Sequence, residues 1–220
     1  MKLLFSSTII TTALGLASST SLPKCSSRST SPCKCPTGTN YSECVTFAVI
    51  GAPAKDIEHL VNDFFQCAWL GVVPYATRGP DNRPGQSIRS APLYTSVGTY
   101  GISELLTEYH VDIDGSFLQK FEQLPSTVPV KYKSGNGSFS GYWVSIEGTS
   151  IFQNETRITW SDYACDTGRV RDFAAFHESA INNATNVLKT QGKIMGTNIV
   201  PYSIQSFQSS SELRRDRTDL

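Results

Sequence analysis

The chain has no excess of charge: its 220 residues carry 19 Lys and Arg against 19 Asp and Glu. A neutral chain offers no electrostatic reason to expect binding to nucleic acid or to an anionic membrane. The only local basic run, Arg214 to Arg217, is interrupted by an acid and is typical of a solvated tail. We therefore expect no nucleic-acid partner.

The sequence also lacks the short motifs of several enzyme classes. It contains no serine nucleophile elbow, no phosphate-binding loop and no dinucleotide fingerprint. The spacing Cys33-x-Cys35 has no second ligand pair at a distance suited to zinc, and Asp112-x-Asp114 lacks the other ligands of a calcium loop. We predict no metal ion and no cofactor.

Long apolar runs are scarce, and the one that stands out lies at the start of the chain. Lys2 precedes an apolar stretch from Leu3 to Ala17, and small residues follow it. This order is typical of a secretory signal peptide, and the stretch is too short and too rich in Ser and Thr for stable membrane insertion. We predict a signal peptide over residues 1–19 and a protein that is secreted or stays in the lumen of the secretory pathway.

Six cysteines and four N-glycosylation acceptors support this interpretation. An even set of cysteines is expected where disulfides persist. The acceptor asparagines, each followed by a residue other than proline and then by Ser or Thr, are Asn40, Asn136, Asn154 and Asn183. We expect glycans at these positions.

Both ends of the chain are polar. Residues 20–42 are rich in Ser, Thr, Pro, Gly and Cys, so we expect an extended arm pinned by disulfides. Residues 203–220 are similarly polar, and we expect a disordered tail. Between them, residues 43–195 are predicted to form one monomeric domain of about 150 residues, which is enough for a sizeable core.

The apolar pattern of this domain predicts a strand, a helix, about six strands and a long helix. Residues 43–50 alternate as a strand does, and a stripe from Ile57 to Ala68 indicates a helix that ends at Gly71. The following strands are expected at 87–94, 103–112, 117–124, 138–147 and 155–164, with the long helix from Val170 to near Gly192. Short turns imply an antiparallel sheet whose apolar face the helices must cover. We predict an α+β fold in which a curved antiparallel sheet wraps around the C-terminal helix.

This order of elements, with particular residues at its landmarks, resembles the SRPBCC superfamily of START-like, helix-grip proteins, which includes birch-pollen-allergen-like proteins and aromatic polyketide cyclases. The similarity covers roughly residues 43–192. The landmarks are Val45-Thr46-Phe47, Ala52-Pro53-Ala54, Leu60-Val61-Asn62-Asp63-Phe64, Trp69, Gly85-Gln86-Ser87-Ile88-Arg89, Glu104-Leu105-Leu106 and Thr156-Arg157-Ile158-Thr159-Trp160.

The resemblance implies a cavity between the sheet and the last helix that binds a hydrophobic small molecule. Such cavities have mostly apolar walls with a few placed polar groups. Members of the superfamily are divided between carriers and enzymes, so fold alone does not decide the function. Two functions stay open: binding of a polyketide- or lipid-like molecule with a polyketide-cyclase-like step, or a non-catalytic secreted carrier of a lipid or sterol.

Two residues are candidates for catalysis. His177 lies close to the apolar stripe of the last helix, and imidazole titrates near neutral pH. Tyr109 is expected on the apolar side of strand 103–112, where a phenol is a partly buried donor. On the same alternation Glu104, Leu106, Glu108 and His110 face solvent. Simpler alternatives are a boundary histidine bonded to water and a tyrosine packed in the core.

The expected ligand-binding residues are Arg89, Tyr142, Trp160, Phe173 and Phe176. Arg89 offers a rigid fork of donors at the cavity mouth. The simpler alternative for Arg89 is a surface arginine paired with Glu104 or Glu108.

In a helix-grip sheet the first and last strands pair antiparallel. Cys44 opens the first strand and Cys165 closes the last one, so we predict a disulfide between them. Cys67 is then expected to bond to an arm cysteine, with Cys33 or Cys35 favoured over Cys25.

Overall fold

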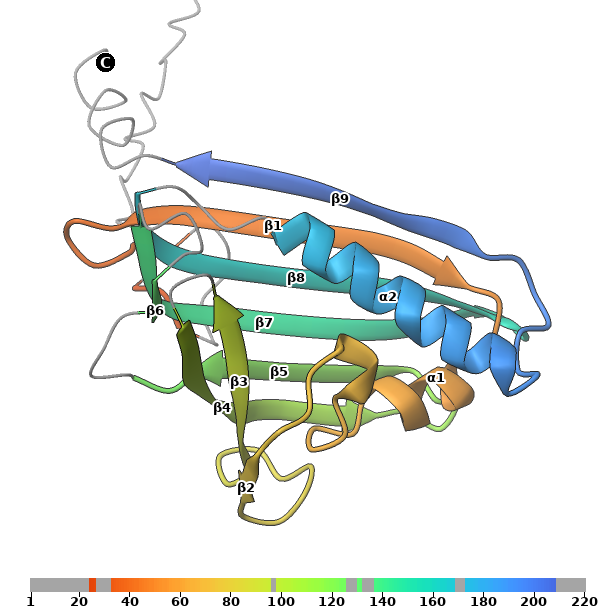
Figure 1. Ribbon diagram of the computed structural model, residues 1–220. Helices are drawn as coiled ribbons and strands as arrows, with labels where there is room; N and C mark the ends of the chain where they lie inside the picture. The colour runs from red at the N-terminus through yellow and green to blue at the C-terminus, as the bar shows by residue number, and fades with distance from the viewer. Residues whose placement is uncertain are drawn as a thin grey trace, which may run out of the picture.

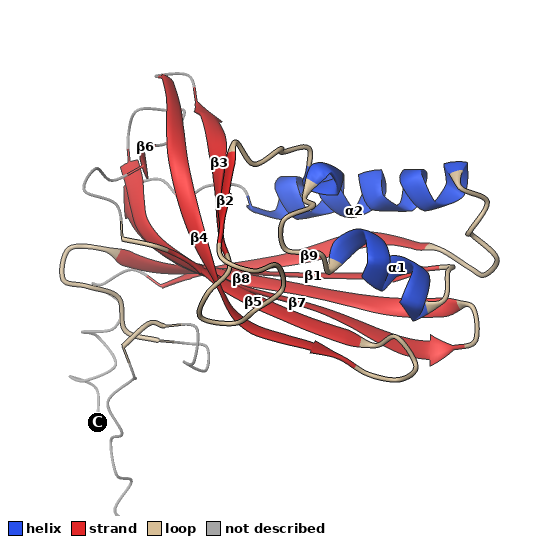
Figure 2. Ribbon diagram, turned by 90° about the horizontal axis from the view of Figure 1, so that it is seen from below, coloured by secondary structure: helices blue, strands red, loops and turns tan. Residues whose placement is uncertain are grey.

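A single antiparallel sheet dominates the fold, and both helices lie on one of its faces (Figures 1 and 2). The computed structural model describes residues 24–26, 33–95, 98–125, 130–131, 137–168 and 173–208, and every structural statement below concerns these residues. The predicted signal peptide, Asn136 and the end of the polar tail lie outside them.

The bounds of the elements follow the chain in order. The strands are β1 (Asn40–Ile50), β2 (Ala76–Arg78), β3 (Ile88–Thr95), β4 (Gly98–Val111), β5 (Phe117–Gln123), β6 (Val130–Lys131), β7 (Gly137–Phe152), β8 (Glu155–Gly168) and β9 (Ile199–Gln208). The helices are α1 (Ala54–Val61), a 3-10 turn η1 (Ala68–Leu70) and α2 (Phe173–Thr190). The sheet order is β2-β3-β4-β5-β7-β8-β1-β9, with β6 paired to β7.

Helix α2 lies along the sheet with one face buried, and the ends of β3 and β4 curl up beside it (Figure 2). Its buried residues are Phe173, His177, Ala180, Ile181, Ala184 and Leu188, the spacing of an amphipathic helix. Ala180, Ile181, Ala184 and Leu188 pack with Ile146, Ile158 and Trp160 of the sheet in one hydrophobic core, and Phe173 packs with Cys44 and Ala164 in a second cluster. This arrangement confirms the predicted helix-grip α+β fold. In the described part of the chain, no helix combines the length and hydropathy needed to cross a membrane.

The first helix is shorter than predicted, because it ends at Val61. The Asp63 carboxylate accepts a hydrogen bond from the backbone N–H of Phe65 at 3.0 Å, and such local side-chain bonds compete with helix continuation. The turn η1 follows, and Gly71 ends it with a left-handed φ of 76°. Phe64 therefore reaches the core from a loop rather than from the helix.

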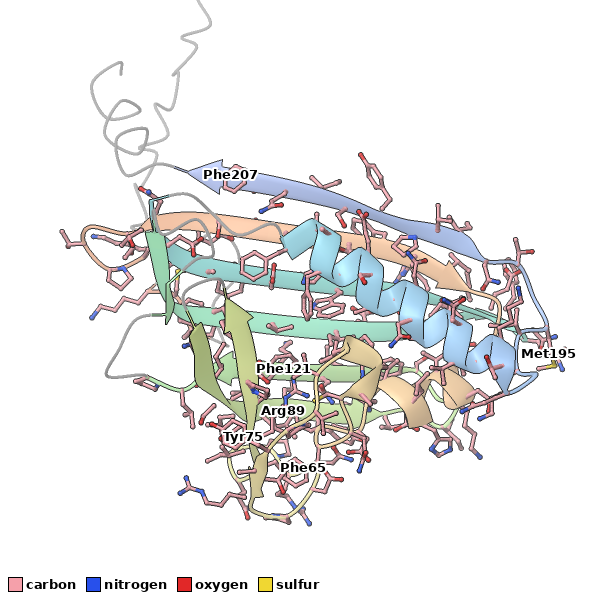
Figure 3. The ribbon with its side chains drawn as sticks, in the orientation of Figure 1. Phe65, Tyr75, Arg89, Phe121, Met195 and Phe207 are labelled. Carbon is pink, nitrogen blue, oxygen red and sulfur yellow. A yellow bond between two sulfur atoms is a disulfide. The ribbon has the colours of Figure 1, made fainter. Side chains whose placement is uncertain are left out.

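The start of the predicted disordered tail is ordered, because residues 203–208 belong to strand β9 (Figures 1 and 3). Strand β9 pairs antiparallel with β1 at the edge of the sheet, and backbone bonds of this kind do not require apolar side chains. Ser203 Oγ and Thr46 Oγ1 are hydrogen-bonded at 2.8 Å. The N–H of Gly196 donates to the Gly51 carbonyl at 2.9 Å and anchors the connection that leads into β9.

A bulge in β4 reverses the predicted facing of its first half. The pairing of β4 with β5 shifts between Leu106 and Glu108, where two steps along β4 correspond to one step along β5. Leu106 is fully buried and Glu104 faces a cavity, although both were expected on the solvent side. Tyr109 lies beyond the bulge and also packs against the core, as predicted. The alternation of side chains between the two faces of a sheet cannot be extrapolated past a bulge.

The predicted disulfide between Cys44 and Cys165 is wrong because the two side chains lie on opposite faces of the sheet. The β1–β8 register pairs Cys44 with Asp162 and Cys165 with Tyr41. Side chains alternate between faces along a strand, so an offset of three residues places two side chains on opposite sides.

The disulfides instead join Cys25 to Cys33 and Cys35 to Cys165. The second of these bonds fastens the described part of the arm to the end of β8. The predicted bond from Cys67 to the arm is also wrong, because Cys67 is buried and takes part in no disulfide; Cys44 takes part in none either.

Candidate functional site

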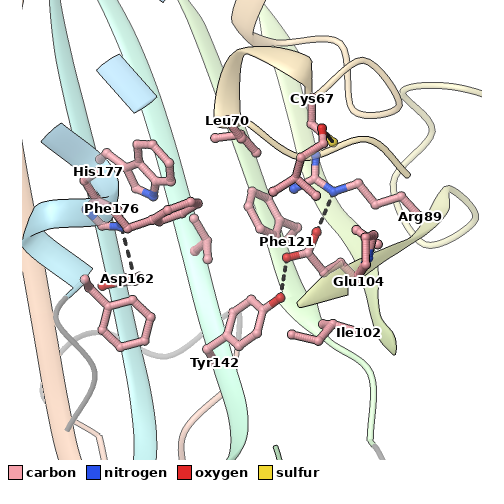
Figure 4. Close-up of a pocket in the computed structure, with 16 residues that line it drawn as sticks. Cys67, Leu70, Arg89, Ile102, Glu104, Phe121, Tyr142, Asp162, Phe176 and His177 are labelled. Carbon is pink, nitrogen blue, oxygen red and sulfur yellow. Dashed lines mark hydrogen bonds and ion pairs between the residues drawn. The ribbon is translucent and has the colours of Figure 1, made fainter. Parts of the chain in front are cut away.

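A cavity of about 110 Å³ lies between the sheet and the first turns of α2 (Figure 4). Its walls are mainly apolar, with polar groups at two places. The lining residues are Cys67, Leu70, Val72, Arg89, Ala91, Pro92, Ile102, Glu104, Phe121, Tyr142, Val144, Trp160, Asp162, Phe173, Phe176 and His177. An apolar cavity of roughly 150 Å³ holds one benzene ring, whereas sites for drug-sized ligands measure about 300–1,000 Å³. The space therefore suits a single ring or a short chain.

Six of the seven candidate residues line this cavity: Arg89, Tyr142, Trp160, Phe173, Phe176 and His177. They come from β3, β7, β8 and α2, so the fold brings together side chains from distant parts of the sequence. All six lie around the space between the sheet and the last helix, and their role in ligand binding stays a prediction.

Tyr109 lies outside the described lining of the cavity, contrary to prediction. It is five residues along β4 from Glu104, which at about 3.3 Å per residue is roughly 16 Å. Its hydroxyl donates to Glu58 Oε1 of α1 at 3.3 Å. Burial, with Glu58 nearby, raises the pKa of Tyr109 to about 12. The core-packing alternative therefore describes Tyr109 better than a catalytic role in the cavity.

At one end of the cavity, Glu104 accepts hydrogen bonds from Arg89 and Tyr142 (Figure 4). Arg89 Nε lies 2.5 Å from Glu104 Oε2, and Arg89 Nη1 donates to the Phe64 carbonyl at 2.9 Å. The guanidinium also lies over the rings of Phe64 and Phe121, 4.3 and 4.6 Å from their centroids. Burial, the largest single effect, lowers the pKa of Arg89, but Glu104 together with Cys67 and Tyr142 outweighs it, and the pKa is raised. The arginine is thus paired with Glu104, but it is not on the surface.

At the other end, His177 is held by partners on two strands (Figure 4). Its Nε2 lies 3.2 Å from Asp162 Oδ2, and its Nδ1 lies 3.0 Å from Thr46 Oγ1 and 3.8 Å from Cys44 Sγ. The side chain is only 1% exposed, so it is no boundary residue. Both ring nitrogens therefore contact protein side chains within the cavity wall. His59 and His110, in contrast, are exposed, as expected.

Trp160 supplies a hydrogen-bond donor that no described protein atom accepts. The residue is buried and lines the cavity, and its indole Nε1 has no partner. Leaving a buried donor unsatisfied costs about 1–3 kcal/mol. A ligand oxygen in the cavity would remove this cost.

Sequence reasoning missed Glu104, Asp162, Cys44 and Thr46. Glu104 was misplaced because of the bulge, which leaves no clear mark in the sequence. Asp162 was detectable, because it is two residues from Trp160 on the same strand and therefore shares its face. Cys44 and Thr46 share a face for the same reason, but they meet His177 only through the packing of α2 on β1.

Comparison with known proteins identifies the family to which this chain belongs. A family model described as a START domain matches residues 41–211. The chain belongs to the START-domain family. The chain is a START-like member of the SRPBCC superfamily, and the resemblance predicted from the sequence is therefore confirmed.

Several solved structures are similar to this chain at low sequence identity. Norcoclaurine synthase from Thalictrum flavum is 11% identical, with a TM-score of 0.49 over 71% of this START-domain chain and 99% of that one. The Zhui aromatase/cyclase from Streptomyces sp. R1128 is 10% identical, with a TM-score of 0.41 over 68% and 83% of the two chains. A protein from Nitrosospira multiformis is 12% identical, with a TM-score of 0.49 over 68% and 98%. No curated protein matches the chain significantly.

Proposed function

We propose that this START-domain protein binds a small, largely apolar molecule in the cavity under α2. The observation that carries the proposal is the unsatisfied Trp160 indole N–H in a mainly apolar wall. A ligand with a ring or short chain for the cavity, and an oxygen that accepts from Trp160, complements both features. A START-like fold is compatible with such a ligand.

Cavity size favours a polyketide-like aromatic ligand over a sterol. A space of about 110 Å³ accepts about one ring, so a larger molecule must leave most of its surface at the mouth or displace the walls. A flat aromatic ketone or phenol places its ring inside and its oxygen near Trp160. A fused four-ring sterol requires the walls to open.

Native mass spectrometry of the protein purified from its source tests this proposal directly. A bound organic molecule with a phenol or ketone oxygen is the expected result. Small aromatic ketones added to the ligand-free protein should raise its melting temperature with concentration, because binding to the folded state stabilises it by mass action.

A matched pair of substitutions locates the binding site. Val144→Phe adds a ring to the cavity wall and should abolish the ligand-dependent rise in melting temperature. Val45→Phe makes the same change on the opposite face of the sheet and should leave the rise intact. A rise that survives Val144→Phe would place the ligand elsewhere.

A second function, a polyketide-cyclase-like proton transfer, is supported by the hydrogen-bonded pair of Tyr142 and Glu104 in the cavity wall. His177 is less suited to this step, because both of its ring nitrogens are bonded within the wall. Loss of an acid–base group lowers turnover by on the order of a hundredfold or more.

Kinetics separate the enzyme from the carrier. With a polyketide-like substrate, Tyr142→Phe should lower kcat about a hundredfold with little change in KM. Tyr109→Phe removes the same hydroxyl outside the cavity and should leave both constants unchanged. Equal turnover in the two variants, or no turnover in the wild type, would favour the carrier.

We also propose that the chain enters the secretory pathway, on the basis of its N-terminal sequence, its glycosylation acceptors and its two disulfides. N-terminal sequencing should find a start between Ser18 and Leu22, and deglycosylation should lower the mass. Asn183 is expected to carry the least glycan, because its Nδ2 donates to the Trp69 carbonyl at 2.9 Å. A retained Met1 with no mass change on deglycosylation would contradict the proposal.

A further inference from the structure

Behind the cavity wall, three groups that bind transition metals converge. The Cys44 thiol, an Asp162 carboxylate oxygen and a His177 ring nitrogen lie within 4.8 Å of one another. Their side chains are buried, at 0%, 3% and 1% exposure. We propose that Cys44, Asp162 and His177 form a binding site for a divalent transition-metal ion, of which Zn²⁺ is the best match.

The three ligands come from regular elements rather than loops. Cys44 on β1 and Asp162 on β8 are direct partners in the antiparallel ladder. His177 projects from α2, and its ring is stacked on Trp160. A site built on packed strands and a helix holds its ligands more closely in place than one built on loops.

The three donor atoms are close enough for one small cation to draw them together, because all lie within 4.8 Å of one another. The nearest contacts use different ring nitrogens: Cys44 Sγ lies 3.8 Å from His177 Nδ1, and Asp162 Oδ2 lies 3.2 Å from His177 Nε2. With Zn–S near 2.3 Å and Zn–N near 2.1 Å, Cys44 Sγ must come within about 4.4 Å of the nitrogen that holds the ion. With the ion on Nε2, beside Asp162, Nδ1 keeps its hydrogen bond to Thr46 Oγ1 at 3.0 Å, as is usual for a metal-bound histidine.

Charge and ligand type favour Zn²⁺. A Cys44 thiolate and the Asp162 carboxylate carry two negative charges, which a divalent ion neutralises while the imidazole of His177 stays neutral. Such balance matters here because unpaired buried charges are costly. The mixed sulfur, nitrogen and oxygen set suits zinc, whereas calcium and magnesium prefer oxygen alone.

The site would leave one coordination position toward the cavity. Asp162 and His177 line the cavity, whereas Cys44 lies outside its described lining. A zinc site with three protein ligands keeps a fourth position for water or a ligand atom. The metal proposal does not depend on the identity of the organic ligand.

A second group of three potential ligands, Cys25, Cys35 and Cys165, does not compete for the ion. All three are in disulfides and offer no thiolate. Cys44 and Cys67 are the two described cysteines outside the disulfides, so Cys67 provides a matched control.

Cobalt titration of the full chain with its disulfides intact tests the proposal. One equivalent of Co²⁺ should give a thiolate-to-cobalt charge-transfer band with strong tetrahedral d–d bands, and Zn²⁺ should displace it. Cys44→Ser should remove the charge-transfer band, and Cys67→Ser should keep it. Asp162→Asn should weaken cobalt binding at least about tenfold.

The proposal is overturned if protein with intact free thiols gives no band, or if the band survives Cys44→Ser. Circular dichroism checks that the variants fold. Should Cys44→Ser not fold, X-ray absorption of the zinc-loaded wild type decides: one sulfur neighbour with nitrogen or oxygen neighbours supports the site, and no sulfur neighbour refutes it.

Discussion

The imidazole of His177 stacks on the indole of Trp160, with ring centroids 4.0 Å apart and planes 17° from parallel. The same imidazole contacts Asp162 on β8 and Thr46 on β1. One side chain of α2 therefore joins the helix to two neighbouring strands at the edge of the cavity. It positions the first turns of the helix over the candidate site.

Removal of this side chain should strongly destabilise the fold. His177→Ala leaves a void beside Trp160 and takes away the partner of a buried carboxylate, so we expect a loss of about 3 kcal/mol or more. The exposed His59 is the control, and His59→Ala should change stability by no more than about 0.5 kcal/mol. Urea unfolding followed by circular dichroism measures both. Similar midpoints for the two variants would show that the His177 contacts contribute little.

The arm should stabilise the domain through its bond to β8. Cys35 and Cys165 are 130 residues apart in sequence, and the chain-entropy model assigns a bond across such a loop up to about 5 kcal/mol. Replacing both cysteines with alanine should therefore lower the urea midpoint. Protein unfolded without reductant should expose two reactive thiols, Cys44 and Cys67. A non-reduced peptide that joins Cys44 to Cys165 would contradict the observed pairing.

Tyr109 should make stability fall at alkaline pH. Its pKa is raised from 10.0 to about 12, chiefly by burial and then by Glu58. Below pH 10 the phenol is protonated in both states; between pH 10 and about 12 the unfolded chain loses its proton first, so unfolding becomes easier. Tyr109→Phe should weaken this dependence. It should not abolish it, because the pKa of Tyr163 is also raised to about 12 by burial.

Urea midpoints near pH 9 and pH 11 measure the effect of Tyr109. The difference between the two midpoints should be smaller in Tyr109→Phe than in the wild type. Equal differences would show that this phenol titrates alike in the folded and unfolded states.

The order of strand β9 should depend on Gly51. A Cβ at this position would lie 2.2 Å from the Gly196 carbonyl oxygen, which is backbone and cannot turn aside like a side chain. Gly51→Ala should therefore displace the connection between α2 and β9. Amide hydrogen exchange should show faster exchange in β9 and in the β1 amides that bond to it. Unchanged protection there would show that pairing with β1 holds β9 without this contact.

The local sequence determined most of the elements. Alternation and helical spacing located strands β1, β3, β4, β5, β7 and β8 and the long helix, because their apolar side chains repeat with the period of the structure they form. The same patterns placed Trp160, Phe173 and Phe176 toward one cavity. Family resemblance then predicted the layer arrangement that the structure shows.

Tertiary structure decided the features that depend on strand register and on contacts between segments distant in the sequence. The bulge in β4 turned Glu104 inward, and the β1–β8 register separated Cys44 from Cys165. Strand β9 forms because β1 offers it an edge, so the mostly polar composition from Ser203 onward gave no indication of order. The cluster of Cys44, Asp162 and His177 exists only where β1, β8 and α2 meet, and a pairing across more than a hundred residues leaves no periodic trace in the sequence.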